Sequence, residues 1–141
     1  MAWETPKTDW YGETVDDVYT GDRFNAKDFN RIKNNLEFLR ELAITMYDDF
    51  AINDLGRDRT PKDYFYADEI NHLEENLDTV SAKSIKRSYG SPPVYYDNGN
   101  VMDFAELNRL EGAILDLYDK LTNESEGRRM FTWNFGMKGG L

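Results

Sequence analysis

Apolar residues recur along three stretches of the chain at alternating spacings of three and four, a pattern typical of amphipathic helices with a heptad seam. The stretches cover residues 29–50, 70–80 and 107–121. The spacing predicts three helices, of which the first is the longest, and turn-forming residues near Asn123 and Gly127 predict the end of the third. The apolar positions are Phe29, Ile32, Leu36, Leu39, Ala43, Met46 and Phe50, then Ile70, Leu73, Leu77 and Val80, then Leu107, Leu110, Ile114, Leu117 and Leu121.

One short motif stands at the start of each predicted helix. It reads acid, apolar, Asn, Arg or His, apolar, and it occurs at residues 28–32, 69–73 and 106–110. We interpret the Asn residues as structural, each bonding a neighbouring backbone group at the start of its helix. Convergence of the three on a ligand is the alternative. The residue after each Asn can pair with an acid on an adjacent helix or on another subunit. The residues are Asn30, Asn71 and Asn108, followed by Arg31, His72 and Arg109.

The two ends of the chain lack the helical spacing. Residues 1–23 mix aromatic residues with turn formers and acids. In residues 128–141, every second position from Phe131 to Met137 is apolar, which in an extended strand places these side chains on one face. Both ends are therefore predicted to be extended aromatic arms.

The elements add up to one mainly α domain over residues 1–141. We predict a three-helix bundle over residues 24–127, built from the repeated helix-start motif, between the N-terminal arm (1–23) and the C-terminal arm (128–141). Asn98-Gly99 suits a tight turn between two short apolar runs, so a small β-hairpin is expected near residues 94–102.

Composition and charge narrow the functional classes. The chain has 17 Lys and Arg against 27 Asp and Glu, a net charge of −10, which disfavours nucleic acid as a partner because phosphate binding needs a basic surface. It has no cysteine and one histidine, His72, which excludes thiol chemistry and a multi-histidine metal site within one chain. No cofactor and no metal site are predicted, and acid pairs such as Asp48-Asp49 are interpreted as solvated surface.

Membrane insertion and secretion are not expected from the sequence. No apolar run approaches the roughly 20 residues that span a bilayer. The first six residues also lack the basic and apolar regions of a signal peptide.

Aromatic residues of the arms are the candidate partner-binding residues, because Trp and other aromatic side chains are common anchors at interfaces. Packing on the chain's own bundle and stacking on a carbohydrate are the alternatives. For a carbohydrate the candidates are Tyr95, Tyr96 and Trp133. The candidate partner-binding residues are Trp3, Trp10, Phe131, Trp133 and Phe135.

The first part of the chain resembles a known family. Residues 5–10 read Thr-Pro-Lys-Thr-Asp-Trp, and residues 22–25 and 28–36 continue Asp-Arg-Phe-Asn and Asp-Phe-Asn-Arg-Ile-Lys-Asn-Asn-Leu. This resembles the start of small tail-region structural proteins of phages and prophages of Gram-positive bacteria. The likeness covers roughly residues 3–40 and extends loosely to the later repeats. It implies a structural or adhesion-related part of a virion tail, near the baseplate or fibre, and it carries no catalytic or binding residue.

The expected function is therefore non-enzymatic. We expect a tail-associated structural or adaptor protein that binds other tail proteins or copies of itself, in the virion or in the host bacterial cytoplasm during assembly. One alternative is a carbohydrate- or host-surface-binding module with exposed aromatic residues. The other is a carboxylate-dependent hydrolase, which needs a pair of convergent carboxylates that no spacing in the sequence demands.

Overall fold

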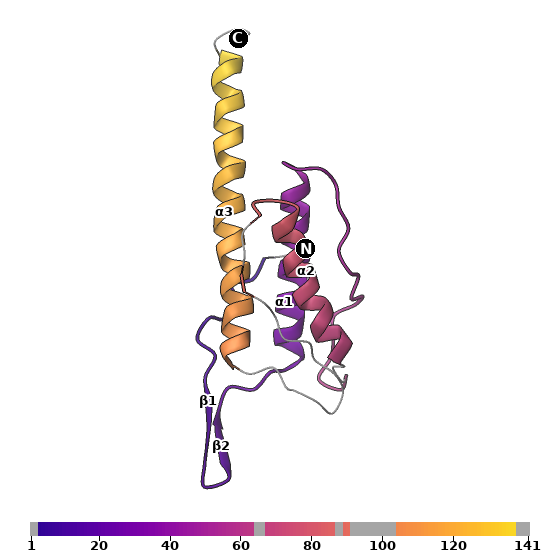
Figure 1. Cartoon of the computed structure of the whole chain (residues 1–141), viewed down its shortest axis with the longest axis vertical. Helices are drawn as coiled ribbons and strands as arrows, with labels where there is room; N and C mark the ends of the chain where they lie inside the picture. The colour runs from indigo at the N-terminus through magenta and orange to yellow at the C-terminus, as the bar shows by residue number, and fades with distance from the viewer. Residues whose placement is uncertain (1–2, 64–66, 87–88, 91–103, 138–141) are drawn as a thin grey trace.

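The computed structural model describes residues 3–63, 67–86, 89–90 and 104–137, which form a mainly α three-helix bundle with a small β-hairpin (Figure 1). The hairpin consists of β1 (Gly12–Val15) and β2 (Val18–Gly21). The helices are α1 (Ala26–Ile44), α2 (Ala67–Ala82) and α3 (Phe104–Met137). No helix in the described part of the chain is long and apolar enough to cross a membrane.

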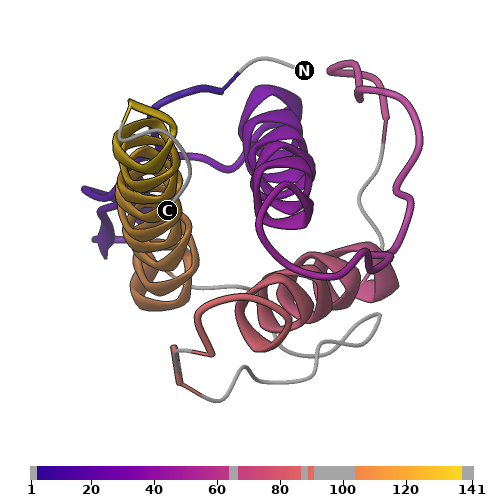
Figure 2. The ribbon, with the colours of Figure 1, turned by 90° about the horizontal axis from the view of Figure 1, so that it is seen from above.

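The predicted seams form the core. From Phe29 to Leu39 in α1, from Leu73 to Val80 in α2 and from Leu107 to Leu121 in α3, the seam residues are fully or almost fully buried. Burial of each such side chain contributes about 1.5–3 kcal/mol relative to leaving it in water. The three helices occupy the corners of a triangle when viewed along the bundle (Figure 2).

The helices run parallel to one another. From Arg31 in α1 to Tyr47 just beyond its end, the partner in α3 moves from Glu111 to Glu124, so both helices advance in the same direction. Parallel neighbours cannot be joined by a short turn, so the chain must return along the outside of the bundle. The return segment after α1 runs antiparallel to it: Arg40 bonds Phe50, and Lys33 bonds Gly56.

Helix α1 ends earlier than predicted and is not the longest. It stops at Ile44, where the Thr45 hydroxyl donates to the carbonyl of Leu42 at 2.6 Å. Phe50 is still buried, but it enters the core from the return segment. The Arg40 guanidinium holds this reversal, donating to the Phe50 carbonyl at 2.8 Å and to Asp49 at 2.9 Å.

Helix α3 runs further than predicted. It passes through Asn123 and Gly127 and ends at Met137, so the prediction of an extended C-terminal arm is wrong up to that residue. A Gly inside a helix costs only about 1 kcal/mol, and an ion pair between Glu124 and Arg128, one turn apart, supports the helix across Gly127. In a helix, alternate residues no longer share one face.

The observed hairpin lies in the predicted N-terminal arm. Gly12 pairs with Gly21 and Val15 with Val18, and the two central residues Asp16 and Asp17 have φ of 53° and 63°. Positive φ at both positions matches the twist of a tight hairpin turn, and Asp tolerates this conformation better than most residues. The hairpin predicted near residues 94–102 lies outside the described residues.

We predict that two glycine substitutions act separately on hairpin and helix. Gly21 has φ +126°, and an added Cβ would lie 2.5 Å from the Gly12 Cα, so Gly21→Ala should open the hairpin. At Gly127 an added Cβ meets nothing within 4 Å, so Gly127→Ala should raise the free energy of unfolding by up to about 1 kcal/mol. NMR contacts between β1 and β2 and urea unfolding measure the two effects. A hairpin that survives Gly21→Ala, or a loss of stability in Gly127→Ala, would contradict this account.

Candidate functional site

Trp10 lies in the core of its own chain. It is 4% exposed, and its indole Nε1 donates to the carboxylate of Glu111. Its ring also lies near those of Phe24 and Phe104, at centroid distances of 6.1 and 6.2 Å. This corrects the prediction that Trp10 docks on a neighbouring molecule, because the side chain is already enclosed by its own bundle.

Trp3 is half-buried and also packs on its own chain. Its ring stacks on Tyr118 of α3 at 4.0 Å, with an interplanar angle of 10°, and lies 5.7 Å from the ring of Phe38 in α1. The other three candidates, Phe131, Trp133 and Phe135, lie on the last turns of α3. The carbohydrate candidates Tyr95 and Tyr96 lie outside the described residues.

The motif asparagines clamp extended segments to the helices. The Arg59 N–H donates to Asn30 Oδ1 at 2.6 Å, and Asn30 Nδ2 donates to the Arg59 carbonyl at 2.9 Å. Asn108 makes the same pair of bonds with Trp10, at 2.8 and 3.0 Å. Their role is structural, as predicted, but their partners are backbone groups far away in sequence and not neighbours in their own helix. Asn71 is the equivalent residue of α2.

A second set of asparagines does the same and was missed in the sequence. Asn35 accepts a hydrogen bond from the backbone N–H of Glu4 and donates one to its carbonyl, and Asn76 makes the same two bonds with Asn53. Each lies five residues after a motif Asn, and this shared offset was the available signal. The third repeat has Ala113 at this position.

The clamps repeat with one geometry. In the N-terminal segment, Glu4 is held by α1 and Trp10 by α3. In the return segment after α1, Asn53 is held by α2 and Arg59 by α1. In both segments the clamped residues are six apart, so each segment bridges two neighbouring helices.

Ion pairs with buried carboxylates link α3 to both other helices. Arg31 of α1 makes two hydrogen bonds to Glu111, at 2.7 and 2.9 Å, and Arg109 of α3 bonds Glu74 of α2 at 2.5 Å. This confirms the expectation that these arginines pair with acids of adjacent helices. Glu111 is 0% exposed, and the Lys7 N–H donates to it as well, at 3.0 Å. Burial raises the pKa of Glu74, against the opposing effect of Arg109.

On the third side of the bundle, between α1 and α2, the described residues form no equivalent pair. The positions equivalent to an Arg–Glu pair hold His72 of α2 and Lys33 of α1, two basic residues. Lys33 is 4% exposed and binds the return segment instead, at 3.0 Å from Asp58 and 3.1 Å from the carbonyl of Gly56.

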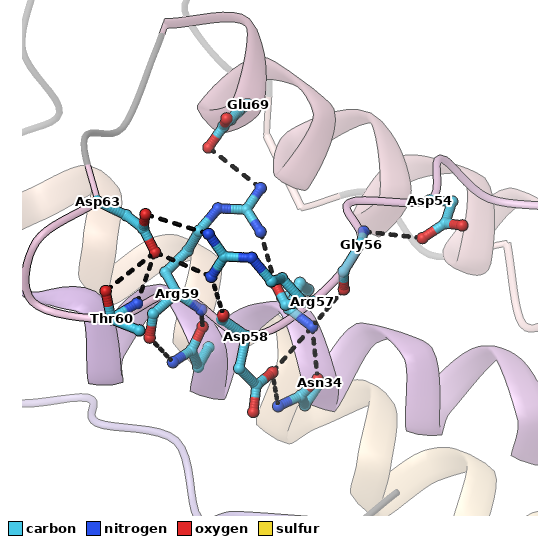
Figure 3. A network of polar contacts seen from close by, with 11 residues as sticks. Asn34, Asp54, Gly56, Arg57, Asp58, Arg59, Thr60, Asp63 and Glu69 are labelled. Atoms are coloured by element: carbon cyan, nitrogen blue, oxygen red, sulfur yellow. Dashed lines mark hydrogen bonds and ion pairs between the residues drawn. The ribbon is translucent and has the colours of Figure 1, made fainter.

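A polar network braces this return segment (Figure 3). Asp63 accepts bonds from Arg57 at 3.0 Å and from the Thr60 N–H at 2.8 Å, which lowers its pKa to about 2. Arg59 lies 3.5 Å from Glu69 at the start of α2. A surface hollow is lined in part by Arg57, Arg59, Asp63 and Glu69, but both arginines already face carboxylates, so we assign the network to structure. Among the described residues no group of three or more His, Cys, Asp or Glu could hold a metal ion.

Two elements project beyond the bundle (Figure 1). The hairpin extends from one end and carries large exposed apolar side chains: Tyr11 at its base is 59% exposed, Val15 55% and Val18 62%. At the other end α3 continues past α1. The last described contacts there join Arg128 to the Met46 carbonyl at 3.0 Å and Glu124 to the Tyr47 hydroxyl at 2.6 Å. We call residues 129–137 the C-terminal extension of α3.

Comparisons with protein-family models, curated proteins and solved structures found no match for this chain. The projecting elements are therefore assessed from their own chemistry.

We predict that Glu111→Gln lowers the free energy of unfolding by about 3 kcal/mol, because it removes one of the two carboxylates that balance the Arg31 guanidinium, the other being Asp28 at 3.0 Å, and places an amide among the donors that Glu111 accepts from. The matched control is Lys120→Gln, which removes an exposed ion pair with Asp116 at 3.5 Å and should cost no more than about 1 kcal/mol. Urea unfolding followed by tryptophan fluorescence measures both. Equal losses in the two variants would show that the buried pair has no special weight.

A clamp can be tested in the same way. Asn108→Asp keeps the acceptor for the Trp10 N–H but replaces the donor to the Trp10 carbonyl with a second oxygen. It should cost about 1–3 kcal/mol, the penalty for a buried polar group without a partner. Asn123→Asp, at an exposed position of the same helix, should change stability by no more than about 0.5 kcal/mol. If Asn108→Asp is as mild as its control, the clamp does not hold the N-terminal segment.

Proposed function

We propose that this chain is a non-enzymatic structural or adaptor subunit of a phage or prophage tail, acting through protein–protein assembly. The observation that carries the proposal is the pair of elements that leave the bundle, the hairpin and the C-terminal extension of α3. None of the hairpin side chains that the structure describes belongs to the buried core, and the seam of α3 is buried as far as Leu121, before the extension begins. Large exposed apolar side chains on such a projection are typical of an interaction site.

The use of the buried charges supports a non-enzymatic role. A catalytic acid or base must reach a substrate, whereas Glu111 and Glu74 bind arginines of neighbouring helices and Lys33 binds the return segment. These groups serve the packing of the bundle.

The tail context rests on the resemblance of residues 3–40. In the structure, this stretch contains the N-terminal segment, the hairpin and most of α1, so the shared motif includes residues of the clamps and of the Arg31–Glu111 pair. A motif of this kind specifies an architecture and not a reaction. Other tail proteins and copies of the chain itself are the partners we propose, in the virion or in the host bacterial cytoplasm during assembly.

We predict that the chain co-purifies with tail particles of the phage or prophage that encodes it, at a constant copy number per particle. Quantitative mass spectrometry of gradient-purified particles makes the measurement, with a known tail protein as the internal standard. Deletion of the coding sequence should leave particles with incomplete tails. Complete, infectious particles that lack the chain would overturn the proposal.

A further inference from the structure

The two projecting elements carry opposite charge. The hairpin, residues 12–21, contains three acids and no base, namely Glu13, Asp16 and Asp17. The C-terminal extension, residues 129–137, contains Arg129 and no acid, and Arg128 directly before it is paired with Glu124, although the chain as a whole has a net charge of −10. Figure 1 shows these elements at opposite ends of the molecule.

Both elements also carry apolar residues. On the hairpin, Val15 and Val18 flank the turn and are more than half exposed. On α3, the seam spacing continues through polar residues at Glu124 and Arg128, and then reaches Phe131 and Phe135. The alternating spacing of three and four thus provides two further apolar positions beyond the bundle.

We infer that the hairpin of one molecule docks on the C-terminal extension of α3 of a second copy, in a head-to-tail contact. This inference rests on the proposed function and names one of its partners. The acidic hairpin would meet the basic extension, and Val15 and Val18 would be covered by the aromatic residues there. A head-to-tail contact leaves one free hairpin and one free extension on every pair, so it continues into a ring or a filament.

Charge disfavours the two symmetric alternatives. A hairpin-to-hairpin contact would bring two sets of acids together, and a pairing of two extensions would offer the acids of neither hairpin a basic partner.

Two variants of the full chain test the inference. The hairpin variant carries Glu13→Gln, Asp16→Asn and Asp17→Asn; Asn accepts the positive φ at both turn positions, so the hairpin is preserved. The extension variant carries Arg129→Glu, Phe131→Gln and Phe135→Gln, and Gln is a good helix former. Circular dichroism and the urea midpoint verify that each variant is folded.

A control variant changes the charge equally elsewhere. It neutralises three exposed acids outside the hairpin, and it should associate like the unmodified chain: Asp48→Asn, Asp78→Asn and Asp119→Asn. A second hairpin variant, Val15→Thr with Val18→Thr, removes apolar surface without changing charge and keeps β-branched side chains at both strand positions.

Light scattering and sedimentation at low ionic strength give the assembly state. We expect the unmodified chain to associate as concentration rises and to dissociate as salt screens the charges. Each of the three interface variants alone should associate about tenfold more weakly or not at all. An equimolar mixture of the charge-neutralised hairpin variant and the extension variant should form dimers and nothing larger, because only one productive contact remains.

Four results would overturn the inference: an unmodified chain that stays monomeric, a hairpin or extension variant that associates normally alone, a mixture that stays monomeric, or a control variant that is as defective as the hairpin variant. Failure here is distinguishable from failure of the proposed function. A monomeric chain that is still present in tail particles would have a different partner, whereas absence from complete particles removes the assembly role altogether.

Discussion

The fully buried carboxylate of Glu111 is the interaction on which the rest of the structure depends. It accepts two bonds from Arg31 of α1, one from the indole of Trp10 and one from the backbone N–H of Lys7. Burial of a carboxylate is costly, and the cost is offset only when charge and hydrogen bonds are all supplied in good geometry. The same group therefore specifies the register of α1 against α3 and the path of the N-terminal segment. If α1, α3 or the N-terminal segment shifted, a buried polar group would lose its partner.

The parallel arrangement explains why asparagine occurs so regularly on the helices. Return segments that run outside a bundle expose backbone N–H and C=O groups with no strand beside them, and such groups need partners. A side-chain amide presents one donor and one acceptor, as a peptide group does, so one Asn satisfies both groups of one residue. Asn30, Asn35, Asn76 and Asn108 each do this. They turn long connections, which are otherwise uncommon in a compact domain, into ordered parts of the structure.

What could be predicted from the sequence was local. The seams, the helix-start motif and the pairing of Arg31 and Arg109 follow from spacing along single helices. The end of α1 was missed because the chain reverses there, and this reversal is held by bonds from Arg40 to Phe50 and Asp49 in the segment that follows. The hairpin at residues 12–21 was missed because its turn is Asp16-Asp17, a weaker signal than Asn-Gly. The C-terminal residues were misread because alternation over four apolar positions imitates a strand, whereas their backbone continues α3. The clamps join residues far apart in sequence, so no local pattern could identify their partners.

The projecting elements are anchored by the same interactions that hold the bundle. Tyr11 and Asp22 close the base of the hairpin through two bonds, at 2.8 and 2.9 Å, and Trp10, directly before Tyr11, is held by Glu111 and Asn108. At the other end, Arg128 lies over the ring of Tyr47 and bonds the Met46 carbonyl, immediately before the C-terminal extension begins. A rigid core thus sets the direction in which each projection leaves it. Binding is favoured when the partners are ordered before they meet, so a small bundle with anchored projections is well suited to bind other proteins. The asparagine clamps contribute to this order, because they fix the extended segments to the helices.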